Sequence, residues 1–292
     1  MAGSPSHKFG QDLGNLLEYV VLYKILKPRL EKFTTKNNFF LDWQTVRPAR
    51  KGKKLCWKDQ YGNSHNLDFV IEAGGTPEKI GEPVAFIEAA WRRYTKHSKN
   101  KAQEIQGAIL PIIEMHKLSA PFYGAVLAGE FSSAALIQLR NNGFSVLYIS
   151  YANVVQAFRS IGFDIAFDEV TADEVFAAAN TKISGLSEAD KDAIRNVLTE
   201  TSKAEIDEFM NSLQETLERV ICQIILIPMF GSEFKSYSVD EALKKLLVLD
   251  LKEPQGKLQK IEVIVDYNNG NTIRASFATA IAASSFLISI RR

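Results

Sequence analysis

Two acidic residues in the first third of the chain have the type and spacing to hold a divalent cation. Asp68 lies within the apolar run Leu67–Ile71, and Glu88 directly follows the apolar run Val84–Ile87. The residues between the two runs are rich in Gly and Pro, which is typical of a hairpin connection. We therefore expect two adjacent strands that each carry one carboxylate. Mg²⁺ prefers oxygen ligands and usually binds one or two carboxylates together with water and phosphate oxygens.

A basic segment follows this acid pair. Its cations are Arg92, Arg93, Lys96, Lys99 and Lys101. The segment leads into an expected helix over Thr95–Lys117, on which Lys101 and Glu104 share one face because they are three residues apart. Arginines at such a place can clamp phosphates bidentately. Carboxylates for a metal beside cations for phosphate favour a phosphodiesterase.

A second group of cations lies in the segment 47–58, which reads RPARKGKKLCWK. Its proposed DNA-contacting members are Arg47, Arg50, Lys51, Lys53 and Lys54. Pro48 and Gly52 indicate a loop, and a basic loop can lie along a phosphate backbone. The other interpretation, a solvated lysine-rich turn, stays open at this point.

The formal net charge of +1 conceals an asymmetry along the chain. Residues 1–101 contain 18 Lys and Arg against 10 Asp and Glu, whereas residues 102–292 contain 17 against 24. Basic surface concentrated near the acid pair favours a polyanionic partner such as double-stranded DNA. Two ordinary solvated faces would produce the same asymmetry.

Several classes of function are disfavoured by the composition. The chain has no apolar run of about 18 residues, so we expect no membrane span. With two cysteines far apart, Cys56 and Cys222, a disulfide framework is not expected and a reducing cytoplasm is the default. The four histidines form no close pairs, which disfavours zinc, and the absence of a Walker-type loop disfavours a nucleotide cofactor.

The predicted elements around the acid pair form an α/β arrangement. Apolar spacings of three and four predict a helix from Phe9 to about Phe33, which Pro28 should bend or end. Glu18 on this helix is either a third acid for the metal site or a boundary carboxylate. Further strands and helices are predicted at 39–46, 122–127, 131–142, 144–150 and 151–161. Apolar strands that alternate with helices indicate a mixed, partly parallel sheet flanked by helices.

The second half of the chain has a different character. Residues 163–218 contain 14 acidic against 4 basic residues and read as helices, which makes them poor contacts for phosphate. Asn268–Asn271 between two alternating runs predicts a β-hairpin. We therefore expect a core over residues 1–162 and an added helical and β-hairpin region over 163–292 that serves dimerisation or target recognition.

Taken together, these residues resemble the PD-(D/E)xK nuclease motif, best known from type II restriction endonucleases. The resemblance rests on Asp68, then about twenty residues, then Glu88-Ala89-Ala90, and covers about residues 10–162. It implies a restriction-endonuclease-like fold in which Asp68, Glu88 and the Ala89 carbonyl bind Mg²⁺. It also implies a homodimer that acts on double-stranded DNA.

The chain departs from this family pattern at Ala90, which stands where the family has its catalytic lysine. One interpretation is that the lysine has moved to the following helix, with Lys101, Lys96 or Lys99 as candidates; Glu104 would then match a subgroup that supplies an acid from that helix. Another is that Ala90 is an inactivating replacement. The last is a relative that only binds DNA.

The function expected from the sequence is therefore a cytoplasmic, Mg²⁺-dependent, site-specific endonuclease of the type II restriction class. The alternative is a catalytically inactive DNA-binding protein on a nuclease-like scaffold. An α/β interaction protein that does not bind nucleic acid is the third hypothesis, and lack of DNA binding at low salt would favour it.

Overall fold

The computed structural model describes the chain except for residues 1–3, 95–97, 169, 230–231, 252–259 and 292. Contacts divide the chain into two units. The first comprises Met1–Met115 and Phe122–Leu213, and the second comprises His116–Pro121 and Gln214–Arg292. Each unit contains a sheet of its own.

The first unit begins with a long helical segment and alternates strands with helices after that. Its helices are α1 (Pro5–Leu17), η1 (Glu18–Leu26), α2 (Lys27–Lys36), α3 (Ser98–Met115), α4 (Ser133–Asn141), α5 (Tyr151–Arg159), α6 (Asp173–Ser184), α7 (Glu188–Thr201) and α8 (Lys203–Leu217). Its strands are β1 (Phe39–Trp43), β2 (Cys56–Lys58), β3 (Ser64–Asn66), β4 (Phe69–Ala73), β5 (Glu82–Arg92), β6 (Phe122–Gly129) and β7 (Ser145–Ser150). The division between the units falls within α8.

The main sheet has the strand order β1-β4-β5-β6-β7. The β1/β4 and β4/β5 pairs are antiparallel, whereas β5/β6 and β6/β7 are parallel. The two parallel pairs are connected through α3 and α4, as parallel strands require a crossover. The predicted α/β class, with a mixed sheet flanked by helices and a C-terminal region containing a β-hairpin, is confirmed.

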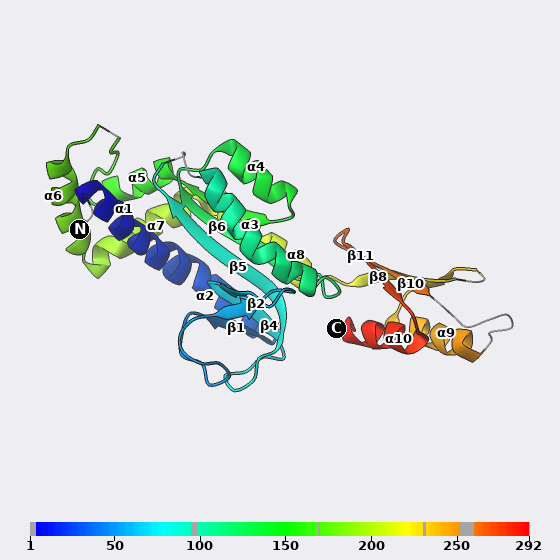
Figure 1. Cartoon of the computed structure of the whole chain (residues 1–292). Helices are drawn as coiled ribbons and strands as arrows, with labels where there is room; N and C mark the ends of the chain where they lie inside the picture. The colour runs from blue at the N-terminus through cyan, green and yellow to red at the C-terminus, as the bar shows by residue number, and fades with distance from the viewer. Residues whose placement is uncertain (1–3, 95–97, 169, 230–231, 252–259, 292) are drawn as a thin grey trace. The chain divides into compact units, whose positions relative to one another are not determined.

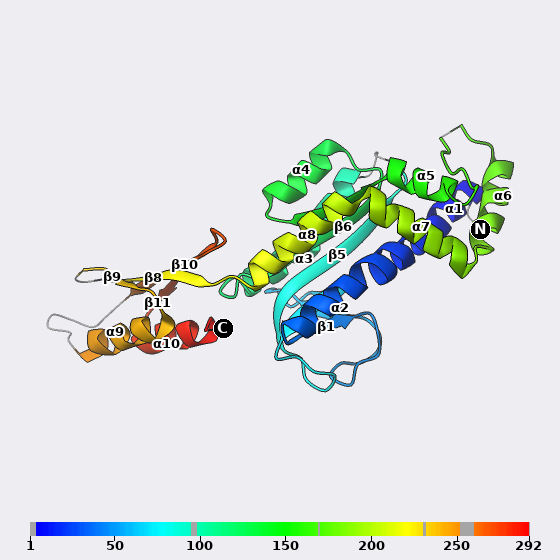
Figure 2. The ribbon, with the colours of Figure 1, turned by 180° about the vertical axis from the view of Figure 1, so that it is seen from behind.

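Helices cover both faces of this sheet (Figures 1 and 2). On one face, buried side chains of α3 such as Ile105 and Ile109 pack with Phe86 and Leu127 of the sheet. The segment from α1 to α2 lies on the other face, where Gly14 is so close to the indole of Trp91 that a Cβ would lie 2.9 Å from its Cδ1 atom. The small residue at position 14 lets α1 approach β5 closely, which positions the site described below.

The first helical segment continues through Pro28, although the sequence predicted a bend or an end there. The backbone widens into a π-helix over Glu18–Leu26, and Pro28 then stands in the first turn of α2. Proline is tolerated at a first helical turn because its missing N–H needs no intrahelical acceptor there. The helical segment therefore continues past the proline, because the π-helix ends just before it and α2 begins there.

The structure differs from the sequence prediction in two further places. Within and just after the predicted basic loop, β2 and β3 form a small antiparallel sheet. The contact-based boundary also lies later than residue 162, because α6 packs on α1 and α7 packs on α5 and η1. Residues 163–213 therefore belong to the first unit.

The second unit is an antiparallel sheet with helices. Its elements are β8 (Ile221–Pro228), β9 (Phe234–Ser236), α9 (Val239–Leu251), β10 (Ile261–Tyr267), β11 (Thr272–Phe277) and α10 (Ala280–Ser289). The strand order is β11-β10-β8-β9, and the predicted hairpin is confirmed by the β10/β11 pair. Within the described residues, no helix has the length and apolar character needed to cross a membrane.

Candidate active site

The sheet register brings the two predicted carboxylates together. Asp68 immediately precedes β4, Glu88 lies within β5, and Phe69 of β4 is paired with Ile87 of β5. Continuing this antiparallel register by one residue places Asp68 opposite Glu88. The Ala89 N–H donates to Asp68 Oδ2 at 2.8 Å, which fixes the Asp68 carboxylate against β5. The predicted association of Asp68, Glu88 and Ala89 is therefore present in the fold.

Both carboxyl groups have raised pKa values. Burial is the largest cause for Asp68, whose pKa rises to about 6 although hydrogen bonds from Ala89 and Gln44 oppose the shift. Burial also raises the pKa of Glu88, to about 8, and the negative charge of Asp68 adds to this effect. Within the described part of the chain, the buried Oε2 atom of Glu88 has no hydrogen-bond partner. Two desolvated acids side by side with an unpartnered oxygen are a site that favours a proton or a cation.

Two further charged groups face this pair from neighbouring helices. Glu18 at the start of η1 raises the pKa of both Asp68 and Glu88 by its negative charge, and Lys101 of α3 lowers both by its positive charge. Of the two interpretations of Glu18, the structure favours a contribution to the acid site, because its charge acts on both carboxyls. The local arrangement is thus three acids with one lysine.

A groove connects this cluster with the start of α1. It encloses about 970 Å³ and is lined by residues of α1 and η1 and by Asp68, Val126, Ala128 and the segment from Glu88 to Tyr94. Glu18, Asp68 and Glu88 all contribute to its lining. The carboxylates are therefore accessible to a substrate that enters the groove.

The other residues predicted near the acid pair have different placements. Ala90 lies two residues after Glu88 on β5 and contributes to the groove and to the apolar cluster beneath α3. Lys101 Nζ is 3.1 Å from Glu104 Oε2, and Arg92 Nη2 is 3.9 Å from the same oxygen. Lys99 of α3 is exposed, whereas the proposed DNA contact Lys96 lies outside the described residues.

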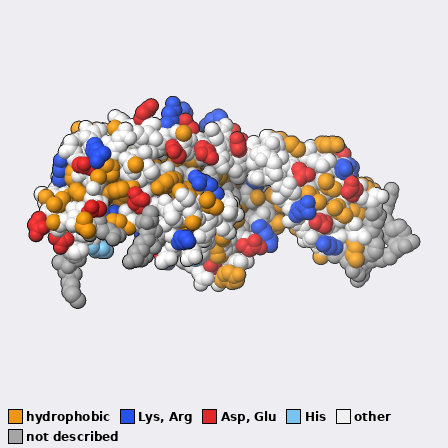
Figure 3. Space-filling model, turned by 90° about the horizontal axis from the view of Figure 1, so that it is seen from above, with side chains coloured by type: hydrophobic (Ala, Val, Ile, Leu, Met, Phe, Trp, Pro, Cys, Tyr) orange, Lys and Arg blue, Asp and Glu red, His pale blue; other side chains and the backbone are white. Residues whose placement is uncertain are grey.

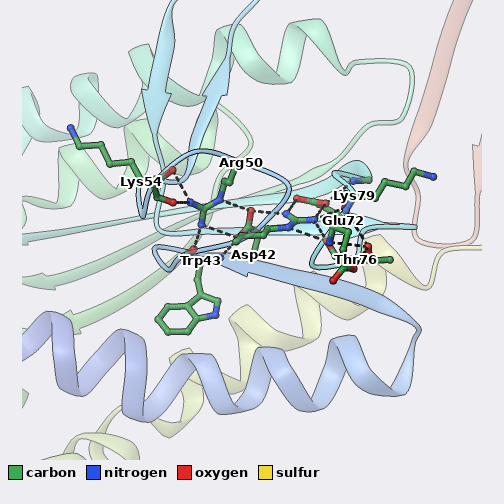
Figure 4. A network of polar contacts seen from close by, with 11 residues as sticks. Asp42, Trp43, Arg50, Lys54, Glu72, Thr76 and Lys79 are labelled. Atoms are coloured by element: carbon green, nitrogen blue, oxygen red, sulfur yellow. Dashed lines mark hydrogen bonds and ion pairs between the residues drawn. The ribbon is translucent and has the colours of Figure 1, made fainter.

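The structure contradicts the proposed DNA contacts by Arg47 and Arg50. The Arg47 side chain is 3% exposed and donates to Asp42 Oδ2 at 2.7 Å and to both oxygens of Glu72 at 2.7 and 3.0 Å. Arg50 donates to both oxygens of Asp42 at 3.1 Å and to the carbonyl of Trp43 (Figure 4). Both guanidinium groups form ion pairs with buried carboxylates. They therefore hold the loop in place and are not free to bind phosphate.

The lysines of the same loop have exposed side chains. Lys51, Lys53 and Lys54 are exposed, and the Lys54 carbonyl accepts a hydrogen bond from Arg50 Nη1 at 3.0 Å. On the face drawn in Figure 3, acidic and basic side chains of the described residues are interspersed. Contact with a polyanion on this face would therefore depend on individual lysines rather than on a continuous basic patch.

Sequence reasoning missed two residues at the site and misjudged a third. Gln44 Nε2 donates to Asp68 Oδ1 at 3.1 Å. Its position follows from the β1/β4 register, in which Trp43 pairs with Phe69, so a pairing of the two strands could have located it. Tyr23 has its pKa raised by burial first and then by Glu18 and Asp68, which places it beside the acids. Arg93 was predicted as a phosphate contact without any expectation of burial, and its side chain is 8% exposed.

The carboxylates of Asp68 and Glu88 fit a hard divalent cation that takes few of its ligands from the protein. Within the described part of the chain, no three His, Cys, Asp or Glu side chains are grouped closely enough to hold a metal by themselves. Mg²⁺ does not require such a cage, because it usually binds one or two carboxylates and keeps several waters. The unpartnered Oε2 of Glu88 beside Asp68 is the oxygen arrangement that such an ion needs.

We expect the metal-free protein to lose stability through the Asp68–Glu88 pair as the pH rises from about 4 to about 8. These carboxyls ionise near 3.8 and 4.5 when unperturbed, but at about 6 and 8 in the folded protein. Between these values the folded state binds more protons than the unfolded state, so the free energy of unfolding falls with pH, and the loss is complete above pH 8. Thermal unfolding in EDTA over this range measures the effect.

Other carboxyls titrate in the same experiment, so the informative quantity is the difference between the wild type and Glu88→Gln. The difference in melting temperature should grow in favour of the variant as the pH rises. Added Mg²⁺ should raise the melting temperature of the wild type more at pH 8.5 than at pH 5. A difference that does not change with pH would contradict the assigned environment of Glu88.

Comparisons with known proteins identify no family for this chain. No protein-family model and no curated protein sequence matches it. Among solved structures, it is similar to the crystal structure of a protein of unknown function, AF1548, at 14% sequence identity and a TM-score of 0.28 over 61% of this chain and 95% of that chain. A likeness at this TM-score supports no conclusion about fold or function.

Proposed function

We propose that this protein is a Mg²⁺-dependent endonuclease that hydrolyses phosphodiester bonds at specific sites in double-stranded DNA, in the manner of a type II restriction enzyme. The observation that carries the proposal is the meeting of Asp68 and Glu88 in the lining of an open groove, where the positive charge of Lys101 acts on both carboxyls. Paired carboxylates next to a lysine are a common arrangement for metal-assisted attack of water on a phosphodiester.

Asp68 and Glu88 are the residues that would hold the metal, and the adjacent Ala89 carbonyl is the third proposed ligand. A bound Mg²⁺ would neutralise charge on the phosphate and support both the attacking water and the leaving oxygen. Gln44 and the Ala89 N–H orient the Asp68 carboxylate by hydrogen bonds at 3.1 and 2.8 Å. Glu18 adds negative charge that favours cation binding over an empty site.

Lys101 is the residue that we assign to the role of the missing lysine. It comes from α3 rather than from β5, and its charge acts on both Asp68 and Glu88. Its ion pair with Glu104 holds the side chain on the same helix face, three residues away. In this position it can orient a water and lower that water's pKa, while Glu104 positions the lysine.

DNA contact is proposed for four exposed lysines and one half-buried arginine. The lysines are Lys51, Lys53 and Lys54 of the basic loop and Lys99 of α3, and the arginine is Arg92, which lines the groove at the end of β5. The second unit is proposed to serve dimerisation or target recognition, and residues 163–213 support the core. A homodimer in the cytoplasm remains part of this proposal.

The second candidate function is a DNA-binding protein without catalysis. Ala90 favours it, because the β5 position two residues after Glu88 has no side chain that can act on water. The two candidates differ in whether Lys101 compensates for this absence. A DNA cleavage assay distinguishes the two candidates. A binding assay does not, because both candidates predict DNA binding that weakens with salt.

We expect the wild type to cut plasmid or phage DNA into discrete fragments with Mg²⁺, and Lys101→Met to cut about a hundredfold more slowly, because positioned acid–base groups typically contribute at least this much. Arg140→Met, in which an exposed cation of the neighbouring helix α4 is removed, should retain nearly full activity in this assay. Initial rates of supercoiled plasmid loss measure both variants.

Ala90→Lys distinguishes the remaining interpretations of the site. If the wild type is inactive and Ala90→Lys cuts, position 90 is the missing catalytic lysine and Lys101 does not replace it. If neither protein cuts but both bind DNA, the noncatalytic function is correct. If neither cuts nor binds at low salt, the proposal of a nucleic-acid partner is wrong.

A further inference from the structure

A buried arginine at the far end of the groove has two unpartnered donors. Arg93, which follows β5 directly, is 8% exposed and lines the groove. Its Nη1 donates to the carbonyl and the hydroxyl of Ser6 at 3.3 and 3.2 Å. Its Nε and Nη2 are buried and have no hydrogen-bond partner among the residues that the structure describes. These two nitrogens form one edge of the guanidinium fork, which binds two oxygens of a phosphate side by side.

The surroundings of Arg93 supply aromatic rings but no counter-charge. Its guanidinium carbon lies 4.3 Å from the ring centre of Phe176, 4.6 Å from that of Tyr94 and 5.2 Å from that of Phe9. Among the described residues, no carboxylate forms an ion pair with it. Burial lowers its pKa from the ordinary value. The rings offset part of the cost of burying this cation, and an anionic ligand would offset more of it.

The start of α1 adds a second feature that favours an anion at the same place. Helix α1 has thirteen residues and begins at Pro5, and Ser4, Ser6 and His7 of its first turn line the groove together with Arg93. Figure 1 shows α1 beside α6 at this end of the first unit, which is consistent with the contacts between these helices. Pro5 has no N–H and the His7 N–H is donated to Ser4 Oγ at 3.3 Å, so the feature that favours an anion here is the partial positive charge of the helix end.

We propose that Arg93 and the first turn of α1 form a phosphate-binding subsite in the groove, separate from the acid pair. The identification of its ligand as a phosphate of the DNA strand rests on the proposed function. Binding of an anion by the subsite does not depend on that function. Arg93 comes five positions after Glu88 in the chain, which corresponds to roughly 16 Å along a strand. The phosphate bound by Arg93 therefore lies a few nucleotides from the bond that is cut. This phosphate is either internal to the strand or at its 5′ end.

Inorganic phosphate tests the subsite without any need for cleavage. In EDTA, phosphate at about ten times its Kd should raise the melting temperature of the wild type by about 3–5 °C. The same response is expected for Glu88→Gln, and it should be absent in Arg93→Met. Arg140→Met, which removes an exposed arginine of α4, should respond like the wild type. Equal responses of Arg93→Met and the wild type would overturn the proposal.

The melting temperature of Arg93→Met without phosphate is also predicted. Methionine fills the space between the rings without a buried charge, so this variant should melt at or above the temperature of the wild type when phosphate is absent. Arg93→Lys keeps the charge but loses the fork and should retain a weaker response to phosphate. Loss of the response in a stable protein therefore reports ligand binding and not unfolding.

Oligonucleotides distinguish the two sources of the phosphate. If the subsite binds a 5′ end, wild-type affinity for a 5′-phosphorylated duplex should exceed that for a 5′-hydroxyl duplex about tenfold, and Arg93→Met should bind both equally. If it binds an internal phosphate, Arg93→Met should lose affinity for both duplexes and for circular DNA to the same degree. Unchanged DNA affinity in Arg93→Met together with a lost response to inorganic phosphate would show an anion site that does not serve DNA.

Discussion

Glu88→Gln is expected to lose at least about a thousandfold in Mg²⁺-dependent DNA cleavage, because it removes a ligand whose charge contributes several kcal/mol to metal-assisted hydrolysis. The same substitution should stabilise the metal-free protein by about 2–4 kcal/mol at pH 8. Burial and Asp68 raise the pKa of Glu88 to about 8, so ionisation of this side chain is costly in the fold and glutamine avoids that cost. Cleavage rates and thermal unfolding in EDTA measure the two effects.

The opposite signs of these effects make the experiment specific. A residue that only supports the fold would lose activity and stability together when it is replaced. Glu82→Gln is the matched control, since Glu82 lies at the exposed start of the same strand and should change neither quantity. Full cleavage by Glu88→Gln would reject the proposed role of Glu88, and a fall in its melting temperature would reject the buried, unpartnered environment that we assign to it.

Much of the fold follows from local patterns. Alternating apolar residues located the β10/β11 hairpin, and apolar runs between helical segments located β6 and β7. These patterns are reliable because a strand or helix must bury one face wherever it packs. The boundary of the first unit could not be read in the same way. The acidic composition of residues 163–213 reflects their solvent-facing sides. These residues belong to the first unit because the apolar sides of α6, α7 and α8 pack on its core.

The sequence predicts only part of the candidate site, and physical chemistry explains which part. Asp68 and Glu88 could be paired from the sequence because adjacent strands joined by a short connection are antiparallel neighbours. The fate of each arginine could not be predicted, because composition does not reveal whether a cation meets a carboxylate, an aromatic ring or solvent. Arg47 meets Asp42 and Glu72, whereas Arg93 meets three rings and no carboxylate among the described residues. Both residues were predicted from the sequence as contacts for phosphate.

Arg47→Met is expected to destabilise the first unit by about 3–5 kcal/mol, because it leaves a buried carboxylate without its counter-charge. The Glu72 side chain is 0% exposed and binds Arg47 through both of its oxygens. Arg47 also donates to the carbonyls of Thr76 and Lys79, so its loss releases the connection between β4 and β5 as well. Chemical denaturation followed by circular dichroism measures the change in the free energy of unfolding.

The matched control is Lys51→Met in the same loop, which removes an exposed cation and should change stability by no more than about 0.5 kcal/mol. Arg47→Met combined with Glu72→Leu should be less destabilised than the sum of the two single variants by about 0.5–3 kcal/mol, because neither charge is then left alone. Additive effects would mean that the two side chains do not act as a pair. If they do act as a pair, the cluster that holds the basic loop beside β1 and β4 also fixes the positions of Lys51, Lys53 and Lys54, the proposed DNA contacts. Arg47→Met should then weaken DNA binding even though Arg47 itself never touches a phosphate.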